Sequence, residues 1–521
     1  MTAPLLGLYP QSDFRVTDGR CRDCPTIPQA LWYFERETIA VPKPGVRVAS
    51  VTPGVDAAAD LRGWLASRTS ATPLEYPQLV WIAAPHVLAG ARLDADATRV
   101  TSASAPLRFE TVPKIALNRS YFDVSSARFF AERSAKIRGT VNGDTIVART
   151  LWPEDFRLDP APAPRDLEPG LPPVLALRGL IRSDARGGAQ SPFGVWSLWQ
   201  RDPAANPLVP GRAALGIMVN GAQGDDDEAH GGHFALVTGR VQDDGAIGDW
   251  LTNNFYSLDI ESEKGIIAAP VPLDNYLADL NSGQAWYRPS HMIVAVLRDA
   301  RAPALLQAAL NRVYIQFWRH QLVYRHATMN CASISVDVLR LLGWNIPARG
   351  PTNRLLASVA FPWLAVSQRS IAKACTQFDY LWEDQTRLMP AAAFEEIGGS
   401  LLQLATVEAA RSANAAGLAR MIGEDLEAIL FARFPQLPSS RAFGDAPVIN
   451  AWEYRSRLPS VPQIVPVPER PFPENLRDAD LRAPVRPASA YAAAIWGTLL
   501  LVGIPIYIYR LWKRWRARSA N

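Results

Sequence analysis

The chain has 521 residues, of which 48% are apolar and 20% charged, a composition typical of globular proteins and unlike that of disordered ones. Its formal net charge of +4 is small for this length, and the basic residues are scattered except at the C-terminal end, which argues against nucleic-acid binding. The length is enough for about two or three domains. Four cysteines are too few for a disulfide framework in a chain of this size.

Residues 1–155 are predicted to form a β-rich N-terminal domain. The strongest local signal is Asn142-Gly143, which separates the strand-like stretches 136–141 and 145–150 and is typical of a tight hairpin turn. Residues 156–173 are rich in proline and predict a linker.

Cys21 and Cys24 have the spacing of a metal or redox pair. No second pair with this spacing follows, and Cys331 and Cys375 are distant in the sequence. The pattern therefore favours a structural turn or a labile disulfide over a zinc site. We expect neither a metal nor a cofactor.

The next domain, predicted at 174–365, contains the candidate chemistry. Residues 231–241 begin with two glycines and predict a buried strand that starts at His233. A polar turn follows, and residues 246–258 predict the second strand of a hairpin. A hairpin centred on residues 243 and 244 places His233 opposite Asn254, on the same side of the sheet.

The partner of His233 depends on where the turn lies. A shift of the turn by one position moves the partner by one or two residues, so Asn253 and Tyr256 are alternatives to Asn254. Asp249 is a further candidate that would lie nearer to the turn.

A second element of this domain is a helix that begins at Cys331. Asn330 is a good N-cap, and Gly343 followed by Pro347 is a normal helix stop. Cys331 begins the apolar stripe of this helix and therefore points toward packed protein. The free N–H groups and the helix dipole at this end would stabilise a thiolate, as in many nucleophilic cysteines.

A cysteine at a helix start, a histidine on a strand and a neighbouring Asn or Asp are the parts of a thiol hydrolase site. The histidine would take the proton from sulfur, and the third residue would orient the imidazole. In this assignment Cys331 is the nucleophile, His233 the base, and Asn254 or Asp249 the orienting residue. The alternative is a core cysteine with a structural histidine. His326 and His230 are rivals for the base.

In order and local pattern these residues resemble the circularly permuted papain-like superfamily, which includes NlpC-related and lecithin:retinol acyltransferase-like proteins. The resemblance rests on Gly232-His233-Phe-Ala-Leu-Val-Thr-Gly239, on Asn330-Cys331-Ala, and on Asp337-Val-Leu-Arg340. The resemblance covers roughly residues 210 to 345. The spacing from His233 to Cys331 is longer than in that superfamily, because residues 264–325 form an insertion. The resemblance implies cleavage or transfer of acyl groups at amide, ester or thioester bonds.

The C-terminal third changes character several times. Residues 366–450 predict helices, and the proline-rich residues 451–487 predict a semi-rigid stalk. Residues 488–509 contain no charge and are long enough to cross a bilayer, and the tail 510–521 is basic. We expect a single membrane-spanning anchor here, with the lipid bilayer as a partner.

Together these patterns predict an α+β protein: a permuted papain-like core after a β-rich domain, with a C-terminal transmembrane helix. The leading hypothesis is a membrane-anchored cysteine hydrolase or acyltransferase acting on a peptide, a lipid or a protein conjugate. A non-catalytic, membrane-tethered interaction protein with a degenerate hydrolase fold is the alternative. No secretory signal is visible at the N-terminus, so we expect the large domain to be cytoplasmic, with free thiols.

Overall fold

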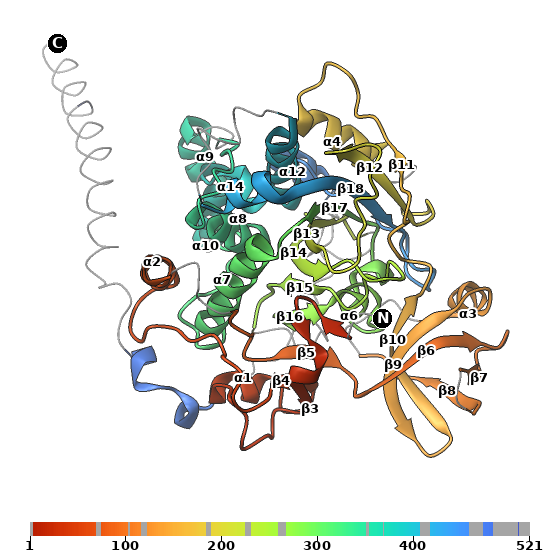
Figure 1. Ribbon diagram of the computed structural model, residues 1–521. Coiled ribbons are helices and arrows are strands. Elements are labelled where there is room, and N and C mark those ends of the chain that lie inside the picture. The colour runs from red at the N-terminus through yellow and green to blue at the C-terminus, as the bar shows by residue number, and fades with distance from the viewer. Residues whose placement is uncertain are drawn as a thin grey trace, which may run out of the picture.

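The chain is an α+β protein built around one large antiparallel sheet (Figure 1). The computed structural model describes residues 4–68, 74–102, 105–115, 122–183, 189–223, 231–258, 267–350, 354–367, 369–406, 417–457, 472–482 and 509. The predicted fold class is confirmed at this coarse level.

The central sheet has eight strands, and every neighbouring pair is antiparallel except β11 and β12. In spatial order the strands are β11 (Ala163–Pro164), β12 (Gly194–Gln200), β18 (Leu426–Phe434), β17 (Ser290–Leu297), β13 (Ala213–Asn220), β14 (His233–Arg240), β15 (Leu251–Asn254) and β16 (Ala269–Pro272). The middle strands are buried at nearly every position. Their near-continuous apolar sequence fits this burial, because a sheet covered on both faces needs no polar side.

Ten helices follow the barrel in the described part of the chain, and α6, α7, α8 and α12 of these contact the strands of the central sheet. Their bounds are α4 (Pro173–Arg182), α6 (Leu273–Ala278), α7 (Arg301–Trp318), α8 (Cys331–Leu341), α9 (Arg354–Ser367), α10 (Ile371–Trp382), α11 (Gln385–Leu388), α12 (Pro390–Thr406), α14 (Gly417–Asp425) and α15 (Ala451–Arg457). Helices α7, α8 and α12 contact β14. The strand that begins at His233 is thus covered by the helix that begins at Cys331.

The N-terminal part forms a five-stranded closed barrel and two small sheets. The barrel strands are β6 (His86–Leu93), β7 (Arg99–Thr101), β8 (Leu107–Thr111), β9 (Ala135–Asn142) and β10 (Thr145–Pro153). The small sheets pair β1 (Leu5–Leu6) with β2 (Tyr9–Pro10), and join β3 (Phe14–Thr17), β4 (Thr38–Pro42) and β5 (Val80–Ala83). The predicted turn is confirmed, since Asn142 pairs with Thr145 and Gly143 has φ +63°.

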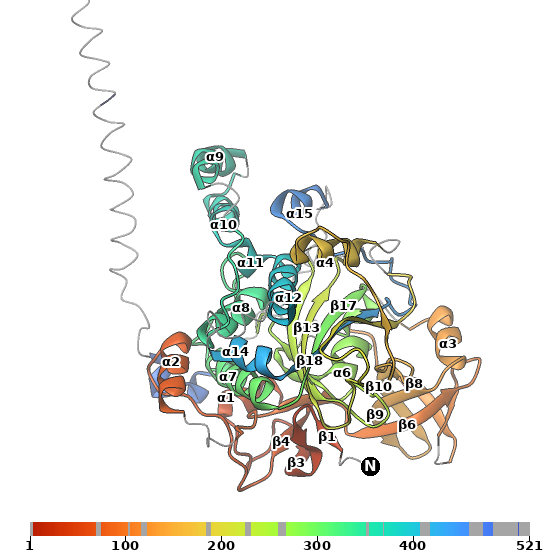
Figure 2. The same ribbon diagram turned by 45° about the horizontal axis from the view of Figure 1, so that its top comes forward.

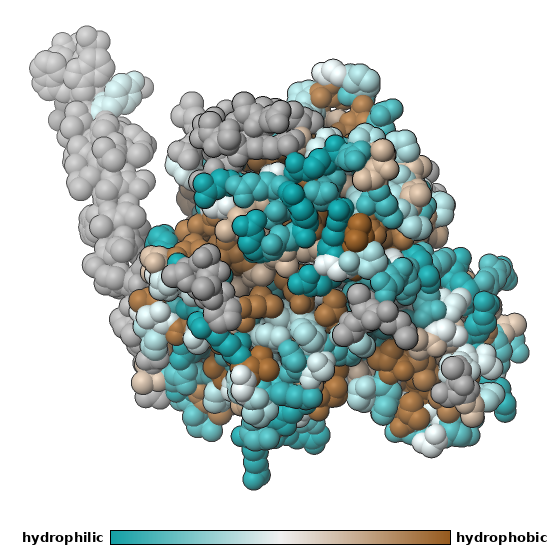
Figure 3. All heavy atoms as spheres, viewed as in Figure 1, coloured by the Kyte–Doolittle hydropathy of each residue, from teal (hydrophilic) through white to brown (hydrophobic). Residues whose placement is uncertain are grey.

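Short helices complete the N-terminal part and the loops. They are α1 (Pro28–Tyr33), α2 (Ala57–Ser67) and α3 (Val124–Ala131), with 3-10 turns η1 (Gln11–Asp13), η4 (Gln284–Trp286), η5 (Glu474–Leu476) and η6 (Ala479–Arg482). Figure 2 shows the barrel and helices α7 and α8 on opposite sides of the central sheet. Figure 3 shows hydrophilic residues over much of one face, with hydrophobic residues exposed between them.

Charged side chains join the barrel to the segment before β15 and to helix α6. Arg138 of β9 donates from Nε to Asp274 Oδ2 (2.9 Å) and from Nη2 to Asp249 Oδ1 (2.7 Å), and Lys136 Nζ lies 2.7 Å from the same Asp249 oxygen. One hydrophobic core also runs through both parts. Within the predicted linker, Ala163–Pro164 is built into the sheet as β11. The predicted domain boundaries stay a prediction.

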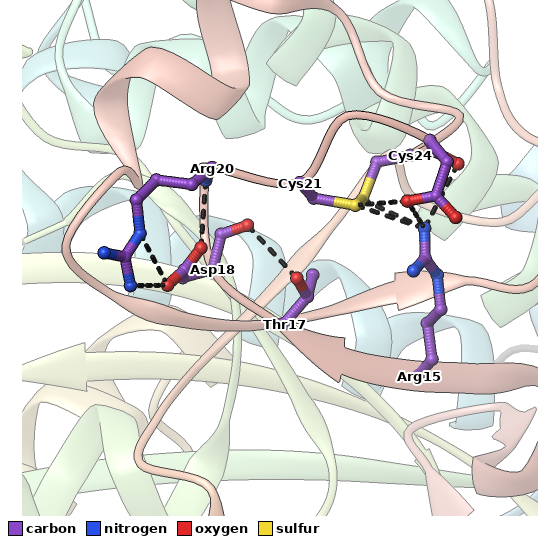
Figure 4. The surroundings of a disulfide bond; sticks show 7 residues. Arg15, Thr17, Asp18, Arg20, Cys21 and Cys24 are labelled. Atoms are coloured by element: carbon purple, nitrogen blue, oxygen red, sulfur yellow. Dashed lines mark hydrogen bonds and ion pairs between the residues drawn. A yellow bond between two sulfur atoms is a disulfide. The ribbon is translucent and has the colours of Figure 1, made fainter.

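Cys21 and Cys24 form a disulfide in the loop after β3 (Figure 4). Arg15 Nη2 lies 3.1 Å from Cys21 Sγ and 3.3 Å from Cys24 Sγ, and it forms an ion pair with Asp23 at 3.1 Å. The disulfide agrees with the labile bond considered for this turn. The disulfide differs from the expectation that the cysteines of this domain are free thiols.

In the part of the chain that the structure describes, no helix is both long and apolar enough to cross a membrane. The predicted anchor 488–509 and the basic tail 510–521 lie outside the described residues, apart from Tyr509.

Candidate active site

Local hydrogen bonds fix Cys331 at the first position of α8. The Asn330 side chain accepts hydrogen bonds from the N–H groups of Ala332 (3.0 Å) and Ser333 (3.1 Å), and the Ser333 hydroxyl accepts from the Asn330 N–H. This capping box provides hydrogen-bond acceptors for N–H groups that have no partner within the helix at its first turn. Asn330 Nδ2 also donates to the Leu388 carbonyl (2.9 Å), so the cap is anchored to the next helices. The start of α8, and with it the sulfur, is held in place.

The sulfur of Cys331 lies in a closed, polar environment. Its side chain is 4% exposed. The Phe234 N–H and the Tyr324 hydroxyl donate toward the sulfur, and the Ala332 N–H is shared between the sulfur and Asn330 Oδ1. These donors, together with the positive charge of Arg288, favour a thiolate, yet burial outweighs them and raises the pKa of Cys331 above its ordinary value.

The resting thiol of Cys331 is therefore protonated. The sequence pattern led to the opposite expectation, because a helix start stabilises a negative charge. Burial cannot be read from the helix alone, and here it decides the protonation state. A reaction at this sulfur requires a base.

His233 is hydrogen-bonded to Asn254, as the hairpin pattern predicts. The distance between His233 Nε2 and Asn254 Oδ1 is 2.8 Å, and both residues are buried. Asn254 Nδ2 donates to the Ile267 carbonyl (3.0 Å), which orients the amide so that Oδ1 faces the imidazole. The Tyr314 hydroxyl donates to the Asn254 carbonyl (2.9 Å) and holds its backbone.

This orientation assigns the tautomer of His233. Because Asn254 Oδ1 only accepts, Nε2 carries the ring proton and Nδ1 is left as a basic nitrogen. Burial, with the charge of Arg288, lowers the pKa of His233 to about 3. The ring is neutral near pH 7 and leaves Nδ1 unprotonated, but a pKa this low makes the resting imidazole a weak base.

The strand register differs by two positions from the predicted one. Leu236 pairs with Asn253 and Thr238 with Leu251, so β15 begins at Leu251 and not at residue 246. Two consecutive turns lengthen the connection between β14 and β15. At the end of this connection the Trp250 indole donates a hydrogen bond to the Arg240 carbonyl (2.8 Å). A two-residue shift keeps the same face of the strand, so Asn254 still reaches His233, now diagonally.

The packing of α8 on β14 brings Cys331 and His233 to the same region of the protein. The Cys331 sulfur accepts a hydrogen bond from the backbone N–H of Phe234, the residue that follows His233 in β14. Among the described residues, no hydrogen bond joins the Cys331 sulfur to the His233 ring. The His233 ring lies near the rings of Tyr256 and Tyr276, each with its centroid at 6.2 Å. Proton transfer requires a closer approach, as is common in sites without substrate.

Three residues near the site carry no signal in the sequence. The Tyr324 hydroxyl donates a hydrogen bond toward the Cys331 sulfur and accepts one from the backbone N–H of Cys331. Arg288 is buried and donates to the Gly221 carbonyl (3.0 Å), and the Tyr276 hydroxyl donates to Asn220. Arg288 and Tyr324 come from irregular segments between elements. Only the nearness of Tyr324 to Cys331 in sequence could have singled it out.

The other predicted residues lie away from the Cys331 sulfur. Asp249 binds Lys136 and Arg138 of the barrel, so it does not orient His233. His326 is exposed, with its ring 5.2 Å from that of Tyr324, and its charge contributes to the low pKa of His233. It therefore lies on the solvent side of the site. His230 falls outside the described residues.

Neither protein-family models, nor curated proteins, nor solved structures match this chain.

Proposed function

We propose that this protein is a cysteine hydrolase or acyltransferase with Cys331 as nucleophile, His233 as base and Asn254 as the residue that orients the imidazole. The observation that carries the proposal is the His233–Asn254 hydrogen bond of 2.8 Å on a strand whose next residue, Phe234, donates its N–H to the sulfur at the start of α8. A neutral, oriented imidazole and a protonated thiol are the two reactants that general-base activation needs.

The proposed reaction passes through a thioester. As the Cys331 sulfur attacks an acyl carbonyl carbon, its proton moves to His233 Nδ1, and the sulfur–carbon bond forms. The tetrahedral adduct collapses, the bond to the leaving group breaks, and His233 returns the proton to that group. Water or a second acceptor then attacks the thioester carbon and loses its proton to the same nitrogen. The sulfur–carbon bond breaks, and His233 returns the proton to the sulfur, which regenerates the thiol.

Two features at the start of α8 support stabilisation of the adduct. The Cys331 N–H has no partner within the helix and donates to the Tyr324 hydroxyl oxygen, so a developing oxyanion would take the place of that oxygen as its acceptor. The Tyr324 hydroxyl lies next to it and is a second donor for a developing oxyanion. Burial of the site strengthens both interactions, because water does not screen them.

The permuted papain-like assignment and the membrane anchor are part of the proposal. The assignment is supported by the order of His233 before Cys331 and by the antiparallel β13–β14–β15 sheet that α8 covers. The anchor is supported by the uncharged residues 488–509 in the sequence. A peptide, a lipid or a protein conjugate would serve as the acyl donor, and the large domain is proposed to be cytoplasmic.

A direct test is acylation of the full chain by an activated acyl ester, followed by peptide mass spectrometry. Cys375 is exposed and free, and it reports the reactivity of an ordinary surface thiol in the same sample. We expect Cys331 to be acylated faster than Cys375 despite its burial, and Cys331→Ala to lose only that adduct. Acylation of Cys375 with Cys331 untouched would contradict the proposal.

The second candidate is a non-catalytic, membrane-tethered interaction protein that keeps a degenerate hydrolase fold. The observation in its favour is the raised pKa of the buried Cys331 thiol, with no hydrogen bond to His233 among the described residues. In that case Cys331→Ser would leave both the fold and every interaction of the protein unchanged. Loss of turnover on any acyl donor after the same substitution would exclude it.

A further inference from the structure

Helices α9 and α10 form a hairpin that projects from the body of the protein (Figure 2). The two helices contact each other, and Phe361 packs on Phe378 with ring centroids 5.6 Å apart. At the base, Tyr380 of α10 stacks on Tyr454 of α15 at 6.5 Å. The hairpin thus has its own aromatic interior and is fixed at one end.

The free end of this hairpin exposes large apolar side chains. Trp363 is 58% exposed, Val366 78% and Ile371 70%. All three lie on the last turns of α9 or the first turn of α10, around the connection at Arg369. We call these three residues and Arg369 the tip. Clustered exposure of large apolar residues is uncommon on a soluble surface and marks a place where something binds.

The charges of the hairpin indicate what that partner is. Between residues 355 and 378 the only charged residues are Arg369 and Lys373, both basic. An apolar, tryptophan-containing end with basic residues and no acidic ones is complementary to a bilayer surface with anionic lipids, where tryptophan is enriched and lysine and arginine are attracted. The predicted anchor at 488–509 would bring this surface to a bilayer.

The length of the helices limits how deep the hairpin reaches. Helix α9 has 14 residues, which correspond to about 21 Å at 1.5 Å per residue. This is shorter than the hydrocarbon core of a bilayer, about 30 Å thick. The hairpin therefore fits insertion into one leaflet and does not fit a crossing.

We propose that the tip inserts into the interfacial region of an anionic lipid bilayer and holds the body of the protein against the membrane surface. Trp363, Val366 and Ile371 enter the boundary between headgroups and acyl chains, and Arg369 binds the lipid phosphates. The inference is independent of the chemistry at Cys331, because none of its residues belongs to that site.

The test uses the full chain reconstituted into vesicles that contain about a third anionic lipid. In a Cys331→Ser background, Cys375 of α10 is the one free thiol and is labelled with an environment-sensitive fluorophore. Emission is compared in vesicles with and without lipid brominated near the carboxyl end of the acyl chains. The matched control carries the label at Val16→Cys of β3, an exposed position on the N-terminal part, in the Cys331→Ser/Cys375→Ser background.

We expect brominated lipid to quench the Cys375 label at least twofold and to leave the Val16→Cys label unchanged. The triple variant Trp363→Ser/Val366→Ser/Ile371→Ser should abolish the quenching, and Arg369→Gln/Lys373→Gln should weaken it more on anionic than on zwitterionic vesicles. Unquenched Cys375 would overturn the proposal. A blue-shifted but unquenched label would show that the chain itself covers the tip. A disulfide between two copies at Cys375 in an unlabelled sample would show a protein interface, and both outcomes overturn the proposal too.

Discussion

His233 should make the folded chain sensitive to acid. Burial holds the pKa of His233 at about 3, compared with 6.5 for an ordinary histidine. Between these two values the unfolded chain binds more protons than the folded one, so stability falls as the pH falls through this window. At pH 7 the ring is largely neutral in both states. At pH 5 it is charged only in the unfolded state, which lowers the free energy of unfolding by about 2 kcal/mol relative to pH 7.

The perturbation that isolates this effect is His233→Gln, which removes the titrating ring and keeps a donor for Asn254. Urea unfolding of both proteins at pH 7 and pH 5 gives the free energy that each loses on acidification. The wild type should lose about 2 kcal/mol more than the variant, because all other titrating groups cancel in the comparison. Equal losses would refute the reasoning, since they would mean that His233 takes up its proton equally readily in the folded and unfolded chain.

Three further substitutions separate the roles assigned to individual residues. Asn254→Ala leaves the buried Nε2–H of His233 without its acceptor, so it should cost about 1–3 kcal/mol of stability in urea and slow acylation of Cys331 at least about tenfold. Tyr324→Phe removes a donor to the sulfur, so the pKa of Cys331 should rise further and its pH–rate profile of alkylation should move to higher pH; an unmoved profile would contradict the contact. Asp249→Asn weakens the ion pairs with the barrel and should lower stability by about 1 kcal/mol without changing the acylation rate, because Asp249 does not orient His233; a slower rate would reverse that assignment.

Features fixed by a few neighbouring residues could be predicted from the sequence. The start of α8 follows from the Asn330 cap, and the tight turn between β9 and β10 follows from Asn142-Gly143. The contact between His233 and Asn254 was also predictable, because side chains alternate along a strand and an error of two positions keeps the same face.

Features that depend on distant parts of the chain could not be predicted. The prediction of helices over residues 366–450 was wrong at 426–434, which form strand β18. This strand pairs with β12 and β17, each more than a hundred residues earlier in the chain, and nothing local specifies the pairing. Asp249 is a turn residue by pattern, and only the position of the barrel shows that it binds Lys136. The pKa of Cys331 depends on how deeply α8 is covered, which the helix sequence does not encode.

The central claim is that His233 removes the proton of Cys331, and the pH dependence of Cys331 acylation in wild type and His233→Ala tests it most directly. Rates are read by mass spectrometry from pH 6 to 9, with Cys375 as the internal reference. The account predicts that the variant loses about a hundredfold or more at pH 7 and regains rate only as rising pH deprotonates the thiol without a base. Parallel profiles of equal rate in the two proteins would contradict it.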